Sequence, residues 1–327
     1  MIPNFDSSIF TIDSENTFNE YAIRLFQYQS VHCTVYASFI KHLGIQPHTI
    51  THYSQIPCLP ISFFKSHTVV SSSLPVETIF ESSKTTGTIA SKHYIPSLNI
   101  YRQSFMTMFK RIYGNPQEYI FLALLPSYLE RSNSSLVYMI QHLIQESQNT
   151  ASGFYLHNFD DLHNAIQTYS HSKIFLIGVT FALLDFAEQY TCNHNNLIVM
   201  ETGGMKGRKK EMIRSEVHEI LQKSFGVSHI HSEYGMTELL SQAYALRNGE
   251  FTPAPWMKVL IRDMYDPRYY VPNGTHGGIN IIDLANWYSC AFIETQDIGR
   301  ILHTNTFSVE GRIDSSDIRG CNLMVQS

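Results

Sequence analysis

The chain has 327 residues, of which 43% are hydrophobic, 13% aromatic and 16% charged, and its formal net charge is −5. Such a composition excludes a disordered or low-complexity chain, because those chains have too little apolar surface to bury. The acidic excess also argues against nucleic acid as a main partner, since binding to phosphates needs a basic surface.

The N-terminal sequence MIPNFDSSIF lacks the basic and apolar regions of a secretory signal, and no apolar run approaches the roughly 18 residues of a membrane span. The five cysteines are odd in number and show no CxxC spacing, which argues against a disulfide framework or a zinc site. We therefore expect a cytoplasmic protein with reduced thiols and no membrane span.

Residues 1–64 are predicted to form an N-terminal helical and extended segment that packs on the core. Apolar residues three and four apart predict one buried helix face, made by Phe18, Tyr21, Ala22, Leu25 and Phe26. The segment ends in a stretch with Pro57 and Pro60, which cannot be a helix interior because proline removes backbone donors.

Residues 65–250 are predicted to form an α/β nucleotide-binding core, because short apolar strands alternate with amphipathic helices. Strands are expected at 119–125, 174–179, 197–200 and 227–230. Helices are expected from Ser134 onward, at 181–187 and at 212–221. This alternation implies right-handed crossovers and a doubly wound parallel sheet that is covered on both faces.

Residues 251–327 are predicted to form a small β-rich, barrel-like lobe that ends in a hinge-like stub. Short strands are expected at 251–259, 278–283, 291–295 and 300–303, separated by proline, glycine and asparagine turns. The lobe would follow the α/β part as a separate unit.

Five polar segments stand out as candidates for a site, since ligands bind beyond the carboxyl ends of parallel strands. They are 80–88 (FESSKTTGT), 201–211 (ETGGMKGRKKE), 231–238 (HSEYGMTE), 295–300 (TQDIGR) and 309–314 (VEGRID). A hydroxyl beside a carboxylate, as at Thr237 and Glu238, suits a phosphate oxygen and Mg²⁺. Each segment taken alone also fits an ordinary turn, helix cap or polar loop.

The sixteen histidines include no HExxH metal motif. Among them, His231 is the best candidate for a functional role, because it directly precedes the Tyr-Gly-Met-Thr-Glu stretch.

The order of the five segments resembles that of the adenylate-forming acyl ligases, the superfamily of acyl-CoA synthetases, peptide-synthetase adenylation domains and firefly luciferase. The strongest match is YGMTE at 234–238. Within this superfamily the chain is most similar to the LuxE-type acyl-protein synthetases. That narrower resemblance rests on 59–66 (LPISFFKS), 125–130 (LPSYLE), 134–139 (SSLVYM), 201–204 (ETGG) and 319–321 (RGC). The resemblance covers nearly the whole chain and implies the fold of the adenylate-forming N-terminal core.

The resemblance implies a mobile loop over the β- and γ-phosphates of ATP. This loop would contain Ser82, Ser83, Lys84, Thr85, Thr86 and Gly87. Lys84 takes the place of a usual glycine, which would reduce the flexibility of the loop but could itself contact phosphate.

The resemblance also implies where the rest of the nucleotide binds. Gly203 and Gly204 would line the adenine pocket, and Tyr234, beside Gly235, would stack on the base. Thr237 would hold the α-phosphate and Glu238 would bind Mg²⁺. Asp297 would bind the ribose hydroxyls, which Arg312 would help to orient.

The implied reaction is attack of a carboxylic acid, here a fatty acid, on the α-phosphorus of ATP, followed by transfer of the acyl group to a cysteine thiol. The thioester would serve a partner reductase or acyltransferase. By resemblance the thiol is that of Cys321, whose thiolate Arg319 would favour; packing of Cys321 in a final strand is the alternative.

Two other functions remain open. The acyl group could pass instead to CoA or to a carrier protein. Alternatively, the chain could be a degenerate, non-catalytic nucleotide-binding fold, which Lys84 favours.

The chain length bears on the expected architecture. Related ligases add a lid of roughly 100 residues, the size of a small domain, after a Gly-Arg-x-Asp hinge, and the lid carries a catalytic lysine. This chain stops 13 residues after Asp314. We therefore expect the lid to be absent and its lysine to be replaced by a core residue, supplied by a partner or not used.

Overall fold

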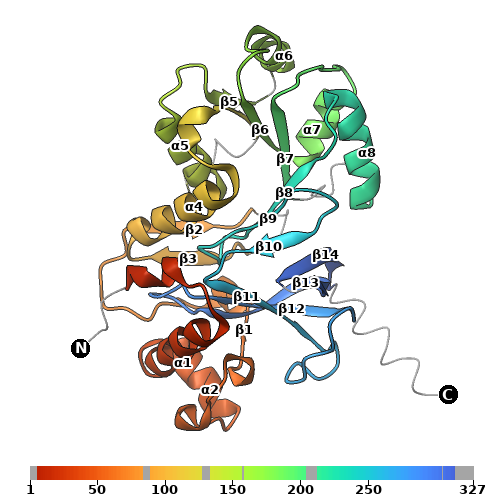
Figure 1. Ribbon diagram of the computed structural model, residues 1–327. Helices are drawn as coiled ribbons and strands as arrows, with labels where there is room; N and C mark the ends of the chain where they lie inside the picture. The colour runs from red at the N-terminus through yellow and green to blue at the C-terminus, as the bar shows by residue number, and fades with distance from the viewer. Residues whose placement is uncertain are drawn as a thin grey trace, which may run out of the picture.

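The computed structural model describes residues 6–83, 89–126, 133–156, 158–203, 212–303 and 305–313. Through these residues runs one large mixed sheet, with helices on both faces of its parallel half and the N-terminal helices beside its antiparallel half (Figure 1).

The parallel half of the sheet has the strand order β5-β4-β6-β7-β8. These strands span Gly153–Tyr155 (β5), Ile120–Leu124 (β4), Ile174–Val179 (β6), Leu197–Thr202 (β7) and His231–Tyr234 (β8). Every residue of β4 and β6 is buried, as near-continuous apolar runs predict for strands covered on both faces. The predicted parallel sheet is confirmed.

Helices cover both faces of the parallel strands, with α4 and α5 on one side and α7 and α8 on the other (Figure 1). The helices of this half are α4 (Leu98–Tyr113), α5 (Ser135–Ser147), α6 (Phe159–Thr168), α7 (Thr180–Ala187) and α8 (Arg214–Phe225). A single 3₁₀ turn, Pro116–Glu118, precedes β4. The hydroxyl of Ser134 accepts a hydrogen bond from the Val137 amide and caps α5, which confirms the predicted helix start.

The antiparallel half continues the same sheet in the order β9-β10-β14-β13-β12-β11. These strands span Ala243–Ala245 (β9), Phe251–Pro253 (β10), Thr306–Arg312 (β14), Phe292–His303 (β13), Gly277–Asp283 (β12) and Met257–Arg262 (β11). Strand β10 pairs with both β9 and β14, so the β-rich part shares backbone hydrogen bonds with the parallel half.

The N-terminal helices pack against this antiparallel half. They are α1 (Glu15–His32), α2 (Thr34–His42) and the short α3 (Phe63–Ser66), joined by 3₁₀ turns and preceded by another at Ser7–Thr11. The Phe26 ring of α1 meets the Phe292 ring of β13 edge to face, with centroids 5.9 Å apart. The proline-containing stretch adds β1 (Leu59–Pro60), which pairs in parallel with β13.

A separate hairpin of β2 (Thr78–Glu81) and β3 (Lys92–Ile95) brackets the hydroxyl-rich loop. Its four-residue strands, TIFE and KHYI, are too short to show a clear apolar alternation, so the hairpin was not predicted from the sequence. The hairpin matters for function because it sets the base of that loop.

The prediction of a strand at 227–230 is wrong. Strand β8 begins at His231, four residues later, and Val227 and His229 are not buried. The strand was misplaced because its buried side chains are polar: Ser232 and Glu233 lie in the sheet and bond to neighbouring side chains rather than forming an apolar run.

The two strands expected at 291–295 and 300–303 form a single strand, β13. Gly299 permits this continuity, because a Cβ at that position would lie 2.0 Å from the Ser308 carbonyl oxygen of β14. Asp297 therefore lies within a strand and not in a turn between the two expected strands.

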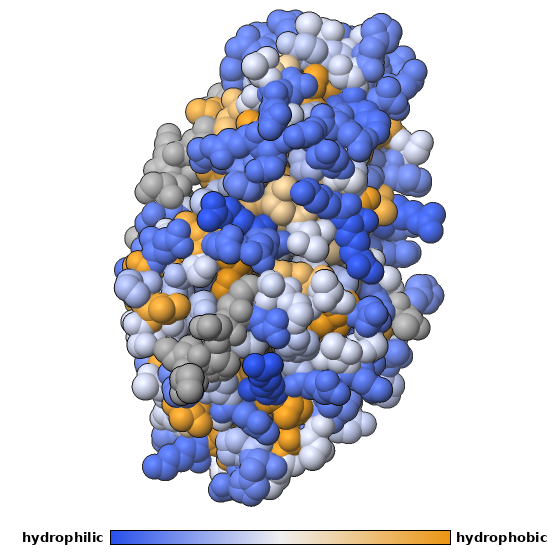
Figure 2. Space-filling model, turned by 60° about the vertical axis from the view of Figure 1, so that its left-hand side comes forward, coloured by the Kyte–Doolittle hydropathy of each residue, from blue (hydrophilic) through white to orange (hydrophobic). Residues whose placement is uncertain are grey.

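No helix among the described residues is long and apolar enough to span a bilayer. On the face shown in Figure 2, outside the grey residues, hydrophobic side chains form small groups separated by polar ones. That face offers no broad apolar surface of the kind that marks large interfaces.

Candidate functional site

The structure brings together three predicted site residues from distant segments. The Tyr234 hydroxyl donates a 2.8 Å hydrogen bond to Asp297 Oδ2, and Arg312 Nε lies 3.4 Å from Asp297 Oδ1. Asp297 and Arg312 face each other directly across β13 and β14. Their cluster lies at the carboxyl end of β8, where the parallel half of the sheet meets the antiparallel half.

The two charged side chains of this cluster differ in burial, and this difference determines the electrostatics of the cluster. The Asp297 side chain is only 14% exposed, whereas that of Arg312 is 72% exposed. Burial raises the pKa of Asp297, against the lowering effects of Tyr234, Arg312 and Arg262. The Asp297 carboxylate is thus a largely desolvated acceptor, and the exposed guanidinium of Arg312 lies beside it.

Beside the cluster, a cavity of about 190 Å³ is lined by residues of β1, β11 and β13 and by Ile313. Ligand pockets commonly measure about 300–1,000 Å³. This cavity by itself would therefore hold only part of a nucleotide.

Thr237 and Glu238 follow β8 in a tight segment, and Glu238 is only 5% exposed. Burial raises the pKa of Glu238, against the lowering effects of a hydrogen bond from Ser91, the backbone, and the positive charges of Arg312 and Lys65. Arg312 thus acts electrostatically on both Asp297 and Glu238.

The base of the hydroxyl-rich loop lies beside Glu238. The Ser82 amide donates to the Ser91 carbonyl at 3.0 Å, and the Ser91 amide donates to Ser82 Oγ at 2.9 Å. Ser83 is exposed. Lys84, Thr85, Thr86 and Gly87 lie outside the described residues, so their predicted roles stay predictions.

A buried polar network supports the end of β7. Glu201 lies 3.4 Å from Arg214 and 3.7 Å from His218, and it accepts a 2.6 Å hydrogen bond from Thr180. The Thr180 hydroxyl also lies 3.2 Å from the carbonyl of Gly203, which has a left-handed φ of 73° that suits glycine. Gly204 lies outside the described residues. This network fixes the turn that is predicted to face adenine.

Glu233 is a further buried carboxylate, and it was not predicted from the sequence. It accepts a hydrogen bond from Thr202, and a Cβ on Gly235 would lie 2.4 Å from its Oε1. Gly235 is thus required by close packing and not by backbone conformation. Burial raises the pKa of Glu233 to about 7, and the charge of Glu201 adds to the rise.

Glu233 should make stability depend on pH. Below its ordinary pKa of 4.5 the carboxyl is protonated whether the chain is folded or not. As pH rises from there to about 7, only the unfolded chain releases the proton, so the free energy of unfolding falls. Relative to Glu233→Gln, wild-type protein should lose roughly 3 kcal/mol between pH 4.5 and pH 8, measured by urea unfolding. An equal difference at both pH values would contradict this.

Lys65 is a further residue whose role the sequence analysis missed. It lies on α3, is exposed, and acts electrostatically on Glu238. The only sequence signal was its place in the segment LPISFFKS.

His231 is not part of this site. It begins β8, at the end of the strand opposite to Tyr234, and its Nδ1 lies 3.0 Å from the Tyr113 hydroxyl. Burial lowers its pKa to about 4, so it is neutral at ordinary pH. Its position in the sequence suggested a role because β8 was predicted too early.

The predicted acyl acceptor, Cys321, lies outside the described residues, as do Asp314 and Arg319. The other four cysteines are buried, which agrees with the structural roles expected for them. Burial raises the pKa of Cys58 to about 12 and that of Cys192 to about 11. Thiols of this kind are poor nucleophiles.

No protein-family model and no curated protein matches the sequence. Solved structures do match. A 2-hydroxyisobutyryl-CoA ligase in complex with 2-HIB-AMP and CoA has a TM-score of 0.70 at 12% identity, over 92% of this chain and 70% of that chain. ATP-bound MatB from Rhodopseudomonas palustris has a TM-score of 0.56 at 14% identity, over 72% of this chain and 48% of that chain. The luciferase-like enzyme of the nonluminescent mealworm Zophobas morio has a TM-score of 0.52 at 15% identity, over 74% and 58% of the two chains.

The chain thus aligns with about half of the length of MatB. The expected α/β fold class is confirmed, and the fold is shared with these ligase structures. At these identities the likeness concerns the fold.

Proposed function

We propose that this chain activates a carboxylic acid with ATP, forming an acyl-adenylate and releasing pyrophosphate. The observation that carries the proposal is the convergence of Tyr234, Asp297, Arg312 and Glu238 at the carboxyl end of β8. Support comes from the fold, which is shared with proteins whose structures hold ATP or an acyl-AMP.

In this proposal, Asp297 accepts the ribose hydroxyls with its two carboxylate oxygens, and Arg312 steers them from the neighbouring strand. The ring of Tyr234 is fixed by Phe251 and Phe307, with centroids 5.9 and 5.6 Å away. The adenine would bind between Tyr234 and the turn at Gly203.

Thr237 would donate its hydroxyl to an α-phosphate oxygen, while donors of the loop that starts at Ser82 would surround the outer phosphates. These groups stabilise the charge that develops as the carboxylate oxygen attacks the α-phosphorus and the bond to pyrophosphate breaks. No protein nucleophile is needed for this step.

The described residues suit a magnesium ion held mainly by substrate. They contain no group of three or more His, Cys, Asp or Glu side chains that could enclose a metal. Mg²⁺ commonly binds through one or two carboxylates together with substrate phosphates, and Glu238 provides one carboxylate beside the proposed phosphate site. When bound, the ion would neutralise phosphate charge.

Lys65 would supply positive charge for the phosphates of ATP. Its side chain is exposed, and it acts electrostatically on Glu238. Lys65→Met should lower exchange of pyrophosphate into ATP without changing the acid that is used.

The finer parts of the proposal concern the acid and the acceptor. We propose a fatty acid as substrate and Cys321 as acceptor, giving an acyl-protein thioester for a reductase or acyltransferase partner; both rest on the LuxE-type resemblance. CoA as acceptor is the second candidate, because the 2-hydroxyisobutyryl-CoA ligase structure holds CoA.

The test is an ATP–pyrophosphate exchange assay with a panel of fatty and aryl acids. We expect exchange with at least one acid, whereas silence across the panel from well-folded protein would favour the non-catalytic alternative. Cys321→Ser should keep exchange and lose acyl labelling of the protein. If the variant still forms acyl-CoA and wild-type protein is never labelled, the acyl-protein proposal is wrong.

A further inference from the structure

The backbone carbonyls of Thr237 and Glu238, in two successive peptide groups, are each held by a buried side chain. His93 Nδ1 lies 2.8 Å from the Thr237 carbonyl oxygen, and Asn286 Nδ2 donates a 2.9 Å hydrogen bond to the Glu238 carbonyl oxygen. Both His93 and Asn286 are 0% exposed. The two residues come from β3 and from the loop after β12, so distant parts of the chain converge on the backbone of Thr237 and Glu238.

These bonds define the chemical state of each side chain. A carbonyl oxygen only accepts, so His93 must carry a proton on Nδ1. Burial lowers the pKa of His93 to about 4, so the ring is neutral and its Nε2 is an acceptor. Because Asn286 donates through its amide nitrogen, its Oδ1 is an acceptor as well.

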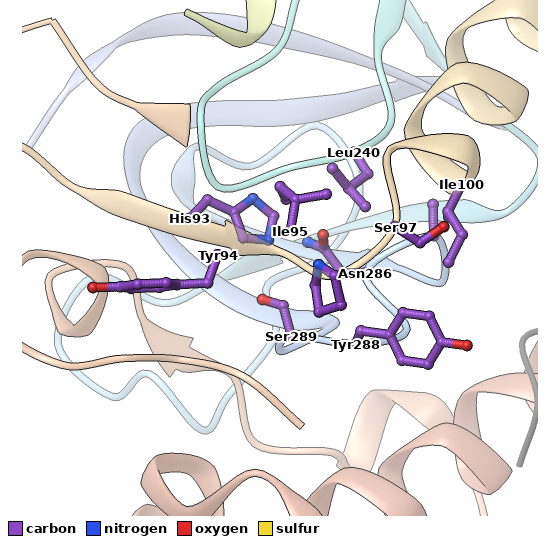
Figure 3. A pocket seen from close by; sticks show the side chains of 11 residues that line it. His93, Tyr94, Ile95, Ser97, Ile100, Leu240, Asn286, Tyr288 and Ser289 are labelled. Atoms are coloured by element: carbon purple, nitrogen blue, oxygen red, sulfur yellow. The ribbon is translucent and has the colours of Figure 1, made fainter. Parts of the chain in front are cut away.

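The two acceptors belong to residues that line one small cavity. His93 Nε2, Asn286 Oδ1 and the hydroxyl of Ser289 have no hydrogen-bond partner among the described residues. All three residues line a cavity of about 10 Å³ (Figure 3). That volume is about what one water molecule needs.

A single water would satisfy this set of atoms. It can donate one hydrogen to His93 Nε2 and the other to Asn286 Oδ1, and accept the hydrogen of the Ser289 hydroxyl. Leaving buried polar atoms unpaired costs about 1–3 kcal/mol each, so the cavity strongly favours such an occupant over an apolar group.

The surroundings of this cavity hold both residues in place. Gln29 of α1 donates to the Asn286 carbonyl at 2.8 Å and to the Trp287 carbonyl at 3.2 Å, and it accepts from the Ala291 amide at 2.9 Å. His93 is paired with Phe80 across the β2–β3 hairpin. The hairpin at the base of the hydroxyl-rich loop and, through Asn286, the N-terminal helix are thereby connected to the backbone of Thr237 and Glu238.

We propose that His93 and Asn286 are positioning residues that fix the backbone of Thr237 and Glu238, and that one buried water bound to His93, Asn286 and Ser289 couples them. They set the direction of the Thr237 hydroxyl and the Glu238 carboxylate without touching the substrate. The inference rests on the proposed function for the roles of Thr237 and Glu238.

The first test uses side chains that mimic one ring nitrogen at a time. In His93→Gln the amide reaches the place of Nε2 and the bond to Thr237 is lost. In His93→Asn the amide nitrogen takes the place of Nδ1 and the bond can form. We expect His93→Gln to lower the kcat of ATP–pyrophosphate exchange about 10- to 100-fold, as displaced catalytic groups do, with little change in KM for ATP. His93→Asn should restore most of this loss.

Asn286→Asp tests the positioning role of Asn286. The change keeps the shape but removes the donor to the Glu238 carbonyl. We expect a higher Mg²⁺ concentration for half-maximal exchange, because Glu238 would no longer be held in place. An unchanged Mg²⁺ dependence would overturn the role of Asn286.

The matched control is His194→Gln. His194 is another buried histidine, 4% exposed, and its ring nitrogens lie 3.1 Å from the Tyr169 carbonyl and 3.1 Å from the Asn196 amide, away from the proposed site. It should lower stability without lowering kcat. If His93→Gln behaves in the same way, or if His93→Asn fails to restore kcat in folded protein, the positioning role is wrong.

A spectroscopic measurement separates this inference from the proposed function. ¹⁵N NMR of His93 in wild-type protein should show a neutral ring protonated on Nδ1 from pH 6 to pH 8. An Nε2-protonated or cationic ring would overturn the inference even if exchange is observed. Absence of exchange together with the expected ring state would instead contradict the proposed function alone.

Discussion

Glu238→Gln is expected to lower ATP–pyrophosphate exchange by about 10²–10³-fold, the range seen when one preorganised electrostatic group is removed. The amide keeps the size and the hydrogen-bonding shape of the side chain but carries no charge for Mg²⁺. Asp297 cannot take over, because in the proposal its two oxygens bind the ribose hydroxyls.

The same substitution should not weaken the fold. Burial raises the pKa of Glu238, so the ionised side chain costs folding free energy above the ordinary pKa of a glutamate. Glu238→Gln removes that cost and should raise the Tm at neutral pH. Lost exchange with an unchanged or higher Tm would identify a functional role and not a damaged structure.

The control for this variant is Glu118→Gln, which alters an exposed carboxylate that pairs with Lys173 on the outside of the molecule. It should leave exchange and its Mg²⁺ dependence unchanged. Glu238→Gln with wild-type exchange and wild-type Mg²⁺ dependence would remove Glu238 from the proposed site.

Gln29→Leu is expected to give the largest loss of stability. Leucine would leave the amide of Ala291 without a partner, whereas the carbonyls of Asn286 and Trp287 would each lose one bond and keep another, from the Ser289 amide and the Ser71 hydroxyl. At about 1–3 kcal/mol for the unpaired amide and about 0.5–1.5 kcal/mol for each of the two lost bonds, the free energy of unfolding should fall by about 2–6 kcal/mol, measured by urea denaturation. Exchange should fall as well, because the loop that carries Asn286 would lose its anchor.

Gln27→Leu provides a matched comparison on the same helix. Gln27 is exposed, so the same chemical change should alter stability by no more than about 0.5 kcal/mol. Equal effects of the two substitutions would show that Gln29 does not anchor the loop.

The parallel half of the fold could be predicted from the sequence because its strands are apolar on both faces. The runs in β4 and β6 have no other stable environment, and the helices between them show a clear apolar face. Strand β8 was misplaced because its burial depends on hydrogen bonds between Thr202 and Glu233 and between Ser232 and His218. Such pairs come from different strands and helices, so no local pattern shows them.

The residues of the candidate site also fall into two groups, those that the sequence could predict and those that it could not. Tyr234, Thr237, Glu238, Asp297 and Arg312 carry a signal in the sequence, because they belong to short motifs in a familiar order. Lys65, His93 and Asn286 carry no such signal of their role. The role of each residue depends on a partner that is distant in the sequence. Lys65 acts electrostatically on Glu238, and His93 and Asn286 bond to the backbone carbonyls of Thr237 and Glu238.

By itself, the sequence determined the α/β class, the parallel strands β4, β6 and β7 and the motif residues, since local apolar periodicity and motif chemistry both depend on neighbouring residues. Only the tertiary structure decided that the β-rich part continues the same sheet, that Asp297 lies within β13, and that Gln29, His93 and Asn286 support the backbone of Thr237 and Glu238. The physical reason is that buried polar groups must find partners, and the partner that completes a hydrogen bond can lie anywhere along the chain.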